Sequence, residues 1–279
     1  MKKTQLLKLA LLAIVACFTA CNNNAEEMLG QEIRLTGKIT PSRVTSLDYQ
    51  STRIIEGQQI GVTITGAQNE HDNVAWTVEA NGTLTNGDNP IYWGDTDITI
   101  TSYHPYNANC DRTSYTFSVN TDQSTNSGYL NSDLLWATET ASIIDNPIAL
   151  AFTHKLAKIN VTLTSEDIAD LSNAEIFICN TNIATGFNPT TGELSTVTSN
   201  IAEIKASATT DEAYTGSAII VPQTVKKGTQ FVKITHNGKV FHYTLPDDIT
   251  YESGHSYNYR LKIEDSNMEN LVEGEESEW

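Results

Sequence analysis

The sequence is poor in basic residues and in charge overall. It has 17 lysines and arginines against 34 aspartates and glutamates among 279 residues, and its formal net charge is −17. A surface this acidic is repelled by phosphate backbones, so nucleic acid is not an expected partner, and neither is direct electrostatic binding to a membrane. Charged residues make up only 18% of the chain, and Thr, Ser and Asn supply much of the remaining polarity. This amino-acid composition is typical of an extracellular β-protein.

The sequence also lacks the common motifs of catalysis. It has no Gly-x-Ser-x-Gly elbow, no His-Glu-x-x-His helix, no phosphate-binding glycine loop and no Cys-x-x-Cys pair. We therefore expect no catalytic residue, no cofactor and no metal site, and we do not expect an enzyme.

Two pairs of residues form weaker metal-binding patterns. His236 and His242 flank one hairpin and could face each other as ligands, although solvent-exposed histidines are the simpler interpretation. Asp95 and Asp97 could hold calcium, but the twelve-residue calcium loop with its glycine is absent. We expect neither pair to bind a metal.

The N-terminus has the layout of an export signal. Two early lysines precede an apolar run over residues 6–15, and small residues lead to Cys21. The run is too short to span a bilayer as a mature helix. We predict a lipoprotein signal peptide over residues 1–20 and Cys21 as the acylated new N-terminus; an ordinary secretory signal cut after Ala20 is the alternative. Residues 21–30 would form an acylated tether similar to the acidic signal that sends Bacteroides-type lipoproteins to the outer face of the outer membrane.

Cysteine usage adds little beyond this signal. The chain has four cysteines, and Cys110 and Cys179 are the two that follow the signal and the tether. They could pair in an oxidising compartment, but two free thiols are at least as consistent with the sequence.

Short alternating segments predict an all-β fold. Ile33, Leu35 and Ile39 share one face, and a period of two recurs over residues 60–64, 115–119 and 257–263. No stretch shows a sustained helical period. Between segments 231–235 and 239–245, the dipeptide at 237–238 is Asn-Gly, which favours a type I′ hairpin turn.

The alternation changes phase in the middle of the chain. Apolar residues occupy even positions over 148–156 and odd positions over 159–163, which predicts a bulge or a change of sheet near Ala157. We therefore place an N-terminal β-sandwich domain over 31–156 and a C-terminal β-sandwich domain with an acidic tail over 157–279.

Six segments stand out by their order and spacing across the mature chain. They are residues 55–62, 103–106, 132–137, 152–159, 218–224 and 252–259. Together they resemble the fimbrillin family, the subunits of the type V pili of Bacteroides-type bacteria. The resemblance implies two consecutive transthyretin-like β-sandwich domains. Within these segments, Trp136 and His154 are expected to be packing residues rather than ligand contacts.

The resemblance also implies assembly by strand exchange. In this scheme a protease removes the first strand and a donor strand from another subunit fills the groove. Arg43 fits the processing position best, Arg53 is the second candidate, and two ordinary surface arginines are the alternative. Burying Ile33, Leu35 and Ile39 would contribute a gross ~5–9 kcal/mol, so we expect the strand to be exchangeable but not dispensable.

The C-terminus differs from what a stalk subunit should show. Ile263 closes the last clear strand pattern, and the residues after it are acidic and do not alternate. We expect an acidic, flexible tail that makes a poor donor strand. This favours a minor, tip or anchor subunit over the main stalk subunit.

These features together predict a structural and adhesive fimbrial subunit, anchored by lipid to the cell outer membrane and exposed at the cell surface. Expected partners are other fimbrial subunits, the outer membrane through the lipid anchor, and a host or bacterial surface ligand. The alternative is a surface glycan-binding lipoprotein that does not polymerise and stacks sugars on Tyr92, Trp93 and Tyr103. Clustering of these rings on one open face would favour it, and their burial would argue against it.

Overall fold

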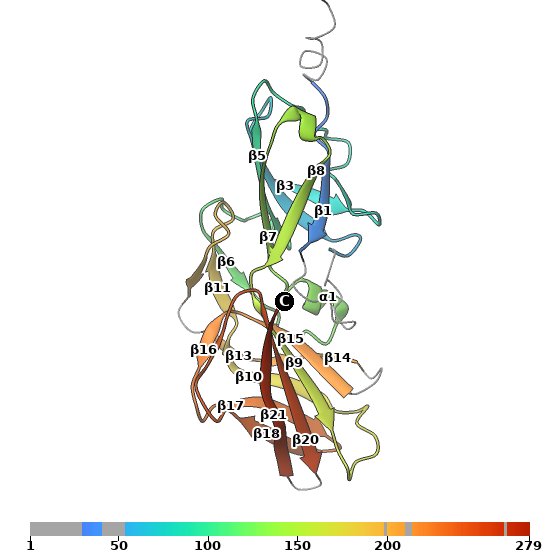
Figure 1. Cartoon of the computed structure of the whole chain (residues 1–279), viewed down its shortest axis with the longest axis vertical. Coiled ribbons are helices and arrows are strands. Elements are labelled where there is room, and N and C mark those ends of the chain that lie inside the picture. Colours follow the sequence, from blue (N-terminus) through green and yellow to red (C-terminus); the bar gives the residue numbers. More distant parts are fainter. Residues whose placement is uncertain (1–29, 41–53, 198–199, 210–213, 265–266) are drawn as a thin grey trace, which may run out of the picture.

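The computed structural model describes residues 30–40, 54–197, 200–209, 214–264 and 267–279. The molecule is elongated, and strands from the two halves of the sequence occupy its two ends (Figure 1). Strands dominate it, which confirms the all-β class. Within the described residues, no helix is long and apolar enough to cross a membrane.

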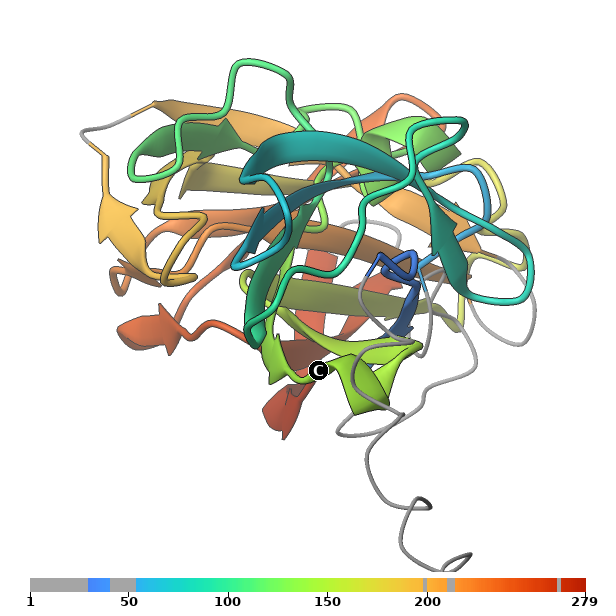
Figure 2. The same ribbon diagram turned by 90° about the horizontal axis from the view of Figure 1, so that it is seen from above.

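The strands of the N-terminal half close into a barrel in the order β1-β4-β3-β2-β5-β7-β8. The view along the long axis shows these strands wrapping around a common interior (Figure 2). Their bounds are β1 Leu35–Ile39, β2 Gln59–Thr65, β3 His71–Val78, β4 Thr83–Thr85, β5 Ile98–His104, β7 Leu135–Ala141 and β8 Ile148–His154, with a 3₁₀ turn at Ile143–Asp145 between β7 and β8. The interior is apolar and holds side chains from every one of these strands. The barrel therefore has its own core.

The C-terminal half is built from two larger sheets and a smaller one. The four-stranded sheet has the order β13-β10-β17-β18, the five-stranded sheet the order β14-β15-β9-β20-β21, and β16 pairs with β19. The bounds are β9 Ala157–Thr164, β10 Glu175–Asn182, β13 Ile201–Lys205, β14 Ser207–Thr209, β15 Tyr214–Ile220, β16 Gln223–Val225, β17 Gln230–His236, β18 Lys239–Thr244, β19 Ile249–Tyr251, β20 His255–Glu264 and β21 Asn267–Glu278. Buried residues of both large sheets belong to one second core.

A three-stranded sheet joins the two halves of the sequence. Strand β6 (Tyr115–Ser118) pairs antiparallel with β11 (Ala184–Phe187), which also pairs with β12 (Leu194–Thr196). Phe117 and Tyr129, the latter in the short helix α1 (Asn126–Leu130), are buried in the C-terminal core. The predicted domain boundary between residues 156 and 157 stays a prediction, because these contacts cross it.

Two local predictions are confirmed. Asn237 and Gly238 have φ values of 48° and 79°, as a type I′ turn requires, and they connect β17 to β18. The phase change near Ala157 is a change of sheet, since β8 ends in the barrel at His154 and β9 begins the five-stranded sheet at Ala157.

The expected flexible tail after Ile263 is wrong. Residues 267–278 form β21, which runs antiparallel to β20 from Glu264↔Asn267 to His255↔Glu278. Backbone hydrogen bonds hold an edge strand whether or not its side chains alternate, so the missing period did not exclude pairing. Trp279, directly after β21, is buried.

The expectation for the hairpin histidines is wrong for His236. Its side chain is buried and its Nε2 lies 3.0 Å from the carbonyl oxygen of Asp170, whereas His242 is exposed. His242 lies directly opposite Lys233, so the two side chains share one face of the hairpin. Lys233 and His236 are three positions apart on one strand and therefore point to opposite faces, which puts His236 and His242 on opposite faces too. They do not face each other as ligands.

Candidate assembly site: the first strand and its groove

Strand β1 is inserted between two other strands of the barrel. It runs antiparallel to β4, with Leu35 opposite Leu84, and parallel to β8, from Leu35↔Ile148 to Ile39↔Phe152. Figure 1 shows β1 beside β8 along the barrel wall. Because a neighbour lies on each side, removing β1 would open the barrel and expose two strand edges.

The predicted apolar face of this first segment is fully buried. Ile33 is 1% exposed, Leu35 0% and Ile39 1%. At Gly37 an added Cβ would stand 3.4 Å from side-chain atoms of Leu84 and Phe152, so the side chains that line the groove close over the strand backbone there. Ile33, Leu35 and Ile39 therefore share one buried apolar face in the barrel core, and the exchange of this strand stays a prediction.

Backbone hydrogen bonds continue N-terminal to β1. The N–H of Ile33 donates to the carbonyl of Ile91 at 2.7 Å, and the N–H of Trp93 donates to that of Gln31 at 2.9 Å. The segment before β1 is therefore paired through its backbone from Gln31, and its first buried side chain is that of Ile33.

Asn146 secures the same segment from the opposite side. Its Oδ1 accepts from the backbone N–H of Arg34 at 2.9 Å, and its Nδ2 donates to the carbonyl of Glu32 at 2.9 Å. These two bonds satisfy backbone groups of the segment just before β1, so the side-chain amide replaces a missing strand partner.

The other sequence-predicted positions lie outside the described residues. These are the lipidation candidate Cys21 and the cleavage candidates Arg43 and Arg53. The last described residue N-terminal to the cleavage candidates is Thr40, whose N–H donates to the carbonyl of Phe152 at 2.9 Å. The first described residue C-terminal to them is Ile54, which is buried.

A buried polar cluster lies where the barrel meets the C-terminal sheets. His154 Nδ1 is 2.8 Å from Asp133 Oδ1, and His104 Nδ1 is 2.9 Å from the Asp133 carbonyl oxygen. Burial lowers the pKa of His104, because the charged imidazolium loses its hydration there. The ring of Trp279 stacks on His154 with centroids 3.7 Å apart and planes 14° from parallel. The end of the described chain is thus anchored at the junction.

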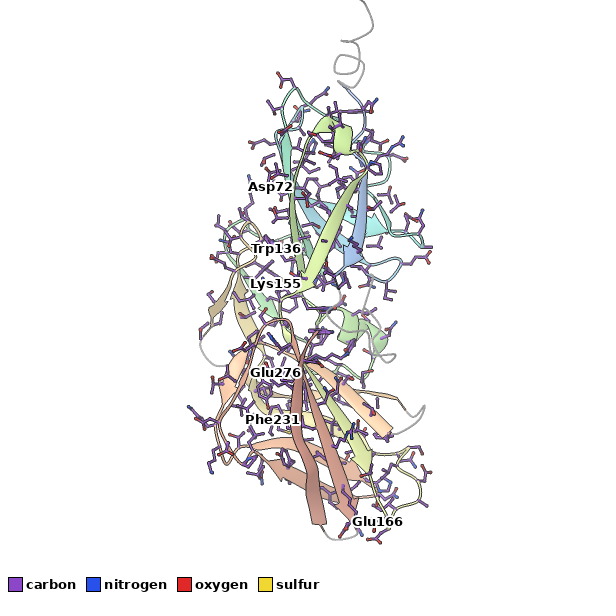
Figure 3. All side chains as sticks on the ribbon, viewed as in Figure 1. Asp72, Trp136, Lys155, Glu166, Phe231 and Glu276 are labelled. Carbon is purple, nitrogen blue, oxygen red and sulfur yellow. The ribbon has the colours of Figure 1, made fainter. Side chains whose placement is uncertain are left out.

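His154 and Trp136 behave as packing residues, as expected. His154 is buried, and Trp136 is half-buried with its Nε1 donating to the carbonyl of Pro189 at 2.8 Å. Lys155 Nζ lies 5.5 Å from the Trp136 ring centroid (Figure 3). Sequence reasoning missed the stack of Trp279 on His154, because nothing local in either segment indicates the other.

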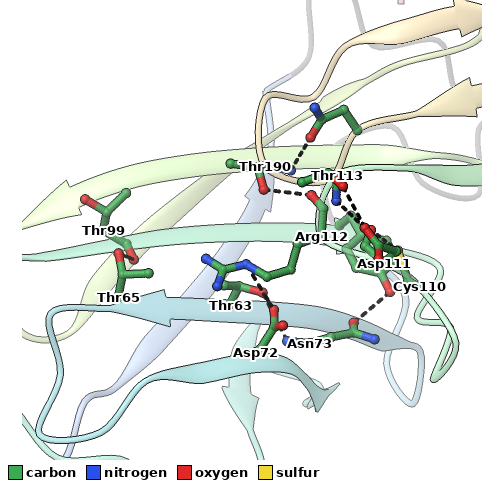
Figure 4. Close-up of polar contacts among 12 residues, drawn as sticks. Thr63, Thr65, Asp72, Asn73, Thr99, Cys110, Asp111, Arg112, Thr113 and Thr190 are labelled. Atoms are coloured by element: carbon green, nitrogen blue, oxygen red, sulfur yellow. Dashed lines mark hydrogen bonds and ion pairs between the residues drawn. The ribbon is translucent and has the colours of Figure 1, made fainter.

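Polar contacts also connect the loop after β5 to both halves (Figure 4). Arg112 Nε lies 3.4 Å from the Asp72 carboxylate of β3. The Arg112 carbonyl accepts from the hydroxyl of Thr190 at 2.7 Å. This loop therefore bridges the barrel and the three-stranded sheet formed by β6, β11 and β12.

Cys110 and Cys179 are both free thiols, so of the two alternatives left open by the sequence the structure has the unpaired one. Cys110 is half-buried and Cys179 is buried. Burial raises the pKa of Cys179 to about 12, so this thiol stays protonated and unreactive at neutral pH.

The proposed aromatic platform is not present. Trp93 is 0% exposed and Tyr103 is 4% exposed, and only Tyr92, at 40%, reaches solvent. The Tyr103 hydroxyl donates to Asn73 Oδ1 at 2.8 Å, and its ring packs edge-on against Phe187. Rings buried in this way cannot stack on sugars, which argues against the glycan-binding alternative.

Known structures share this fold. Two putative cell adhesion proteins, from Bacteroides ovatus and Bacteroides uniformis, match with TM-scores of 0.67 and 0.66 at 20% and 21% identity. These matches cover 90% and 89% of this chain and 98% and 99% of theirs. The tip fimbrial protein Mfa3 of Porphyromonas gingivalis, with a C-terminal truncation, matches with a TM-score of 0.52 at 11% identity over 89% of this chain and 100% of that one. No curated protein sequence matches the chain.

A family model described as Fimbrillin-like matches residues 42–279, which is most of the chain. The matched span begins after β1 and contains the remaining barrel strands and all the C-terminal sheets. The chain therefore belongs to the fimbrillin-like family, a family of structural adhesion proteins and not of enzymes.

Proposed function

We propose that this protein is a structural and adhesive subunit of a cell-surface fimbrium, exported as an outer-membrane lipoprotein through Cys21. Cleavage near Arg43 releases β1, and a strand from another subunit takes its place. Its partners are other fimbrial subunits, the outer membrane and a surface ligand. Its two halves are two consecutive transthyretin-like domains. Family membership and the likeness to fimbrial and adhesion proteins support the fimbrial part of this proposal.

The burial of β1 is the main observation that supports the proposed strand exchange. Three side chains with exposures of 0–1% fill the groove, and β4 and β8 pair with the backbone on its two sides. A barrel that loses this strand exposes the apolar groove and both edges, so it gains by accepting another extended chain. The family match from residue 42 onwards leaves out β1 and nearly coincides with the product of cleavage after Arg43.

The state of the C-terminal strand supports a terminal position in the fimbrium over a repeating one. A stalk subunit must accept one strand and donate another. In this chain β21 is paired with β20, and Trp279 is buried against His154, so donating β21 would cost these contacts. A subunit that accepts a strand and keeps its own belongs at an end of the assembly, as a minor, tip or anchor subunit.

The test is the N-terminus and the gel mobility of protein taken from washed cell surfaces. For the native chain we expect a new N-terminus at Val44 and bands of higher mass on unboiled denaturing gels. Arg43→Ala should abolish both, and Arg53→Ala is the matched control that should leave them unchanged. A uniform acylated Cys21 terminus with a single monomer band, alike in all three proteins, would contradict cleavage and exchange and leave a stationary surface lipoprotein.

A further inference from the structure

Three potential metal ligands meet where the last strand returns to the start of β20. Glu252 lies in the turn after β19, His255 begins β20, and Glu276 lies near the end of β21. One ligand atom from each lies within 4.8 Å of the other two. Figure 3 places Glu276 near the middle of the long axis of the molecule. The three residues are exposed or half-buried, so an ion can reach them from solvent.

The imidazole of His255 is oriented as a metal ligand. Its Nδ1 lies 3.0 Å from the carbonyl oxygen of Ser253, and a carbonyl only accepts, so Nδ1 carries the hydrogen. In the neutral ring Nε2 then holds the lone pair. Metal-binding histidines commonly donate their second ring N–H to a backbone carbonyl, which fixes the tautomer and the ring orientation.

The atom facing Nε2 is also an acceptor. Glu276 Oε1 lies 3.9 Å from Nε2, too far for a hydrogen bond and within the reach of two ligands on one ion. A cation between these two acceptor atoms, either a proton on the ring or a metal ion, would turn their repulsion into attraction. In a tetrahedral site with metal–ligand bonds of about 2.1 Å, donor atoms stand about 3.4 Å apart. Small rotations of the two exposed glutamates reach this spacing.

The surrounding contacts hold the glutamates near the same point. The hydroxyl of Tyr257 accepts from the backbone N–H of Glu252 at 2.8 Å, and its one hydrogen is shared between Glu276 Oε1 at 3.2 Å and the Thr250 carbonyl oxygen at 3.1 Å. The turn itself is fixed, because the N–H of Gly254 donates to the carbonyl of Leu156 at 2.8 Å. One tyrosine thus orients a ligand and anchors the backbone of another, as residues around metal ligands do.

We propose that Glu252, His255 and Glu276 form a binding site for a divalent transition-metal ion of the zinc type, which ties β21 to the β19–β20 turn. One imidazole nitrogen and two carboxylate oxygens suit zinc with a water as fourth ligand. Calcium is disfavoured because it takes six to eight oxygen ligands. The site rests on the fold alone and not on the proposed strand exchange. Its binding energy opposes release of β21, since release separates Glu276 from the other two ligands.

The experiment is a titration of the purified full chain with zinc chloride in metal-free buffer, followed by calorimetry. We expect one saturable site. His255→Ala and Glu276→Gln should each weaken it at least about tenfold, since even the loss of outer partners of metal ligands costs 10–100-fold. His242→Ala, which removes an exposed histidine elsewhere on the C-terminal half, is the matched control and should bind zinc as the parent does. Glu252→Gln, in an exposed turn, provides a second test if His255→Ala does not fold.

Hydrogen exchange tests the link to β21. At a zinc concentration of about 100 times the dissociation constant, amides of β21 that exchange by opening of the strand should slow about a hundredfold. His255→Ala should remove this protection. Absence of saturable zinc binding, zinc binding that is unchanged in both His255→Ala and Glu252→Gln, or saturable binding of calcium in preference to zinc would each overturn the proposal.

Discussion

The first and last described strands of this protein are secured in opposite ways. Strand β1 has five residues, lies between two neighbours and fills its groove with apolar side chains. Strand β21 has twelve residues, lies at the edge of its sheet beside β20 and precedes a single buried aromatic anchor, Trp279. Length is therefore a poor guide to how firmly a strand is held. Insertion and burial make β1 the stronger structural element, whereas β21 can open without breaking a sheet in two.

The largest expected effect is on the inserted strand. Leu35→Ala removes a fully buried side chain and should lower the free energy of unfolding by about 2–5 kcal/mol, measured by urea denaturation. Lys38→Ala changes an exposed residue of the same strand and should lie within about 0.5 kcal/mol of the parent. A loss below about 1 kcal/mol for Leu35→Ala would show instead that β1 is held by backbone pairing alone and is not the more firmly held strand.

A smaller effect is expected at the end of the edge strand. Trp279→Ala removes the stack on His154 and should cost about 1–3 kcal/mol, less than a tryptophan in a closed core because a chain end can relax. Hydrogen exchange should show faster opening of β21 and unchanged protection of β1. Faster exchange in both strands would instead mean that the junction residues couple them.

The smallest expected effect is on the pH dependence of the free energy of unfolding, which should involve β21 and not β1. Burial raises the pKa of Tyr257 to about 12, and the negative charge of Glu276 on β21 adds to this. A raised folded-state pKa gives stability that is present below pH about 10 and is lost as the pH rises towards 12. Tyr257→Phe should therefore flatten the alkaline decline by about 1 kcal/mol at pH 11, measured from urea midpoints.

Leu35→Ala is the reference for this pH test. The contacts that Leu35 makes in the groove are apolar, so its loss in stability should be the same at pH 8 and pH 11. An alkaline decline that is as steep in Tyr257→Phe as in the parent would show that other tyrosines carry it.

What the sequence predicts well is local or periodic. The face shared by Ile33, Leu35 and Ile39 follows from a period of two, and it is buried as expected. The turn at Asn237 and Gly238 follows from the positive φ that both positions require. These features depend on neighbouring residues, so a single sequence contains the information needed to predict them.

What the sequence does not predict is pairing between distant segments. The alternation around Phe117 predicts a strand, but nothing in it names β11 as the partner. The acidic stretch after Ile263 lacks a period, yet its backbone pairs with β20 along most of its length. Likewise the ligand atoms of His255 and Glu276 are brought together only by the β20–β21 register. Such contacts are set by the whole fold, and local patterns carry no signal for them.

The position of β1 also sets the order in which the barrel can be completed. The contact between Arg34 and Asn146 spans 112 residues, and β8, the parallel neighbour of β1, begins just beyond Asn146 at Ile148. In a chain that emerges N-terminus first, β1 appears before all other strands of the barrel and must wait for β8. Such long-range closure is slow, because loop entropy is lost before the contacts form. During that interval the nascent chain exposes an apolar strand and an unfinished groove, so the barrel is completed sooner when β8 follows rapidly or when this segment is protected until β8 arrives.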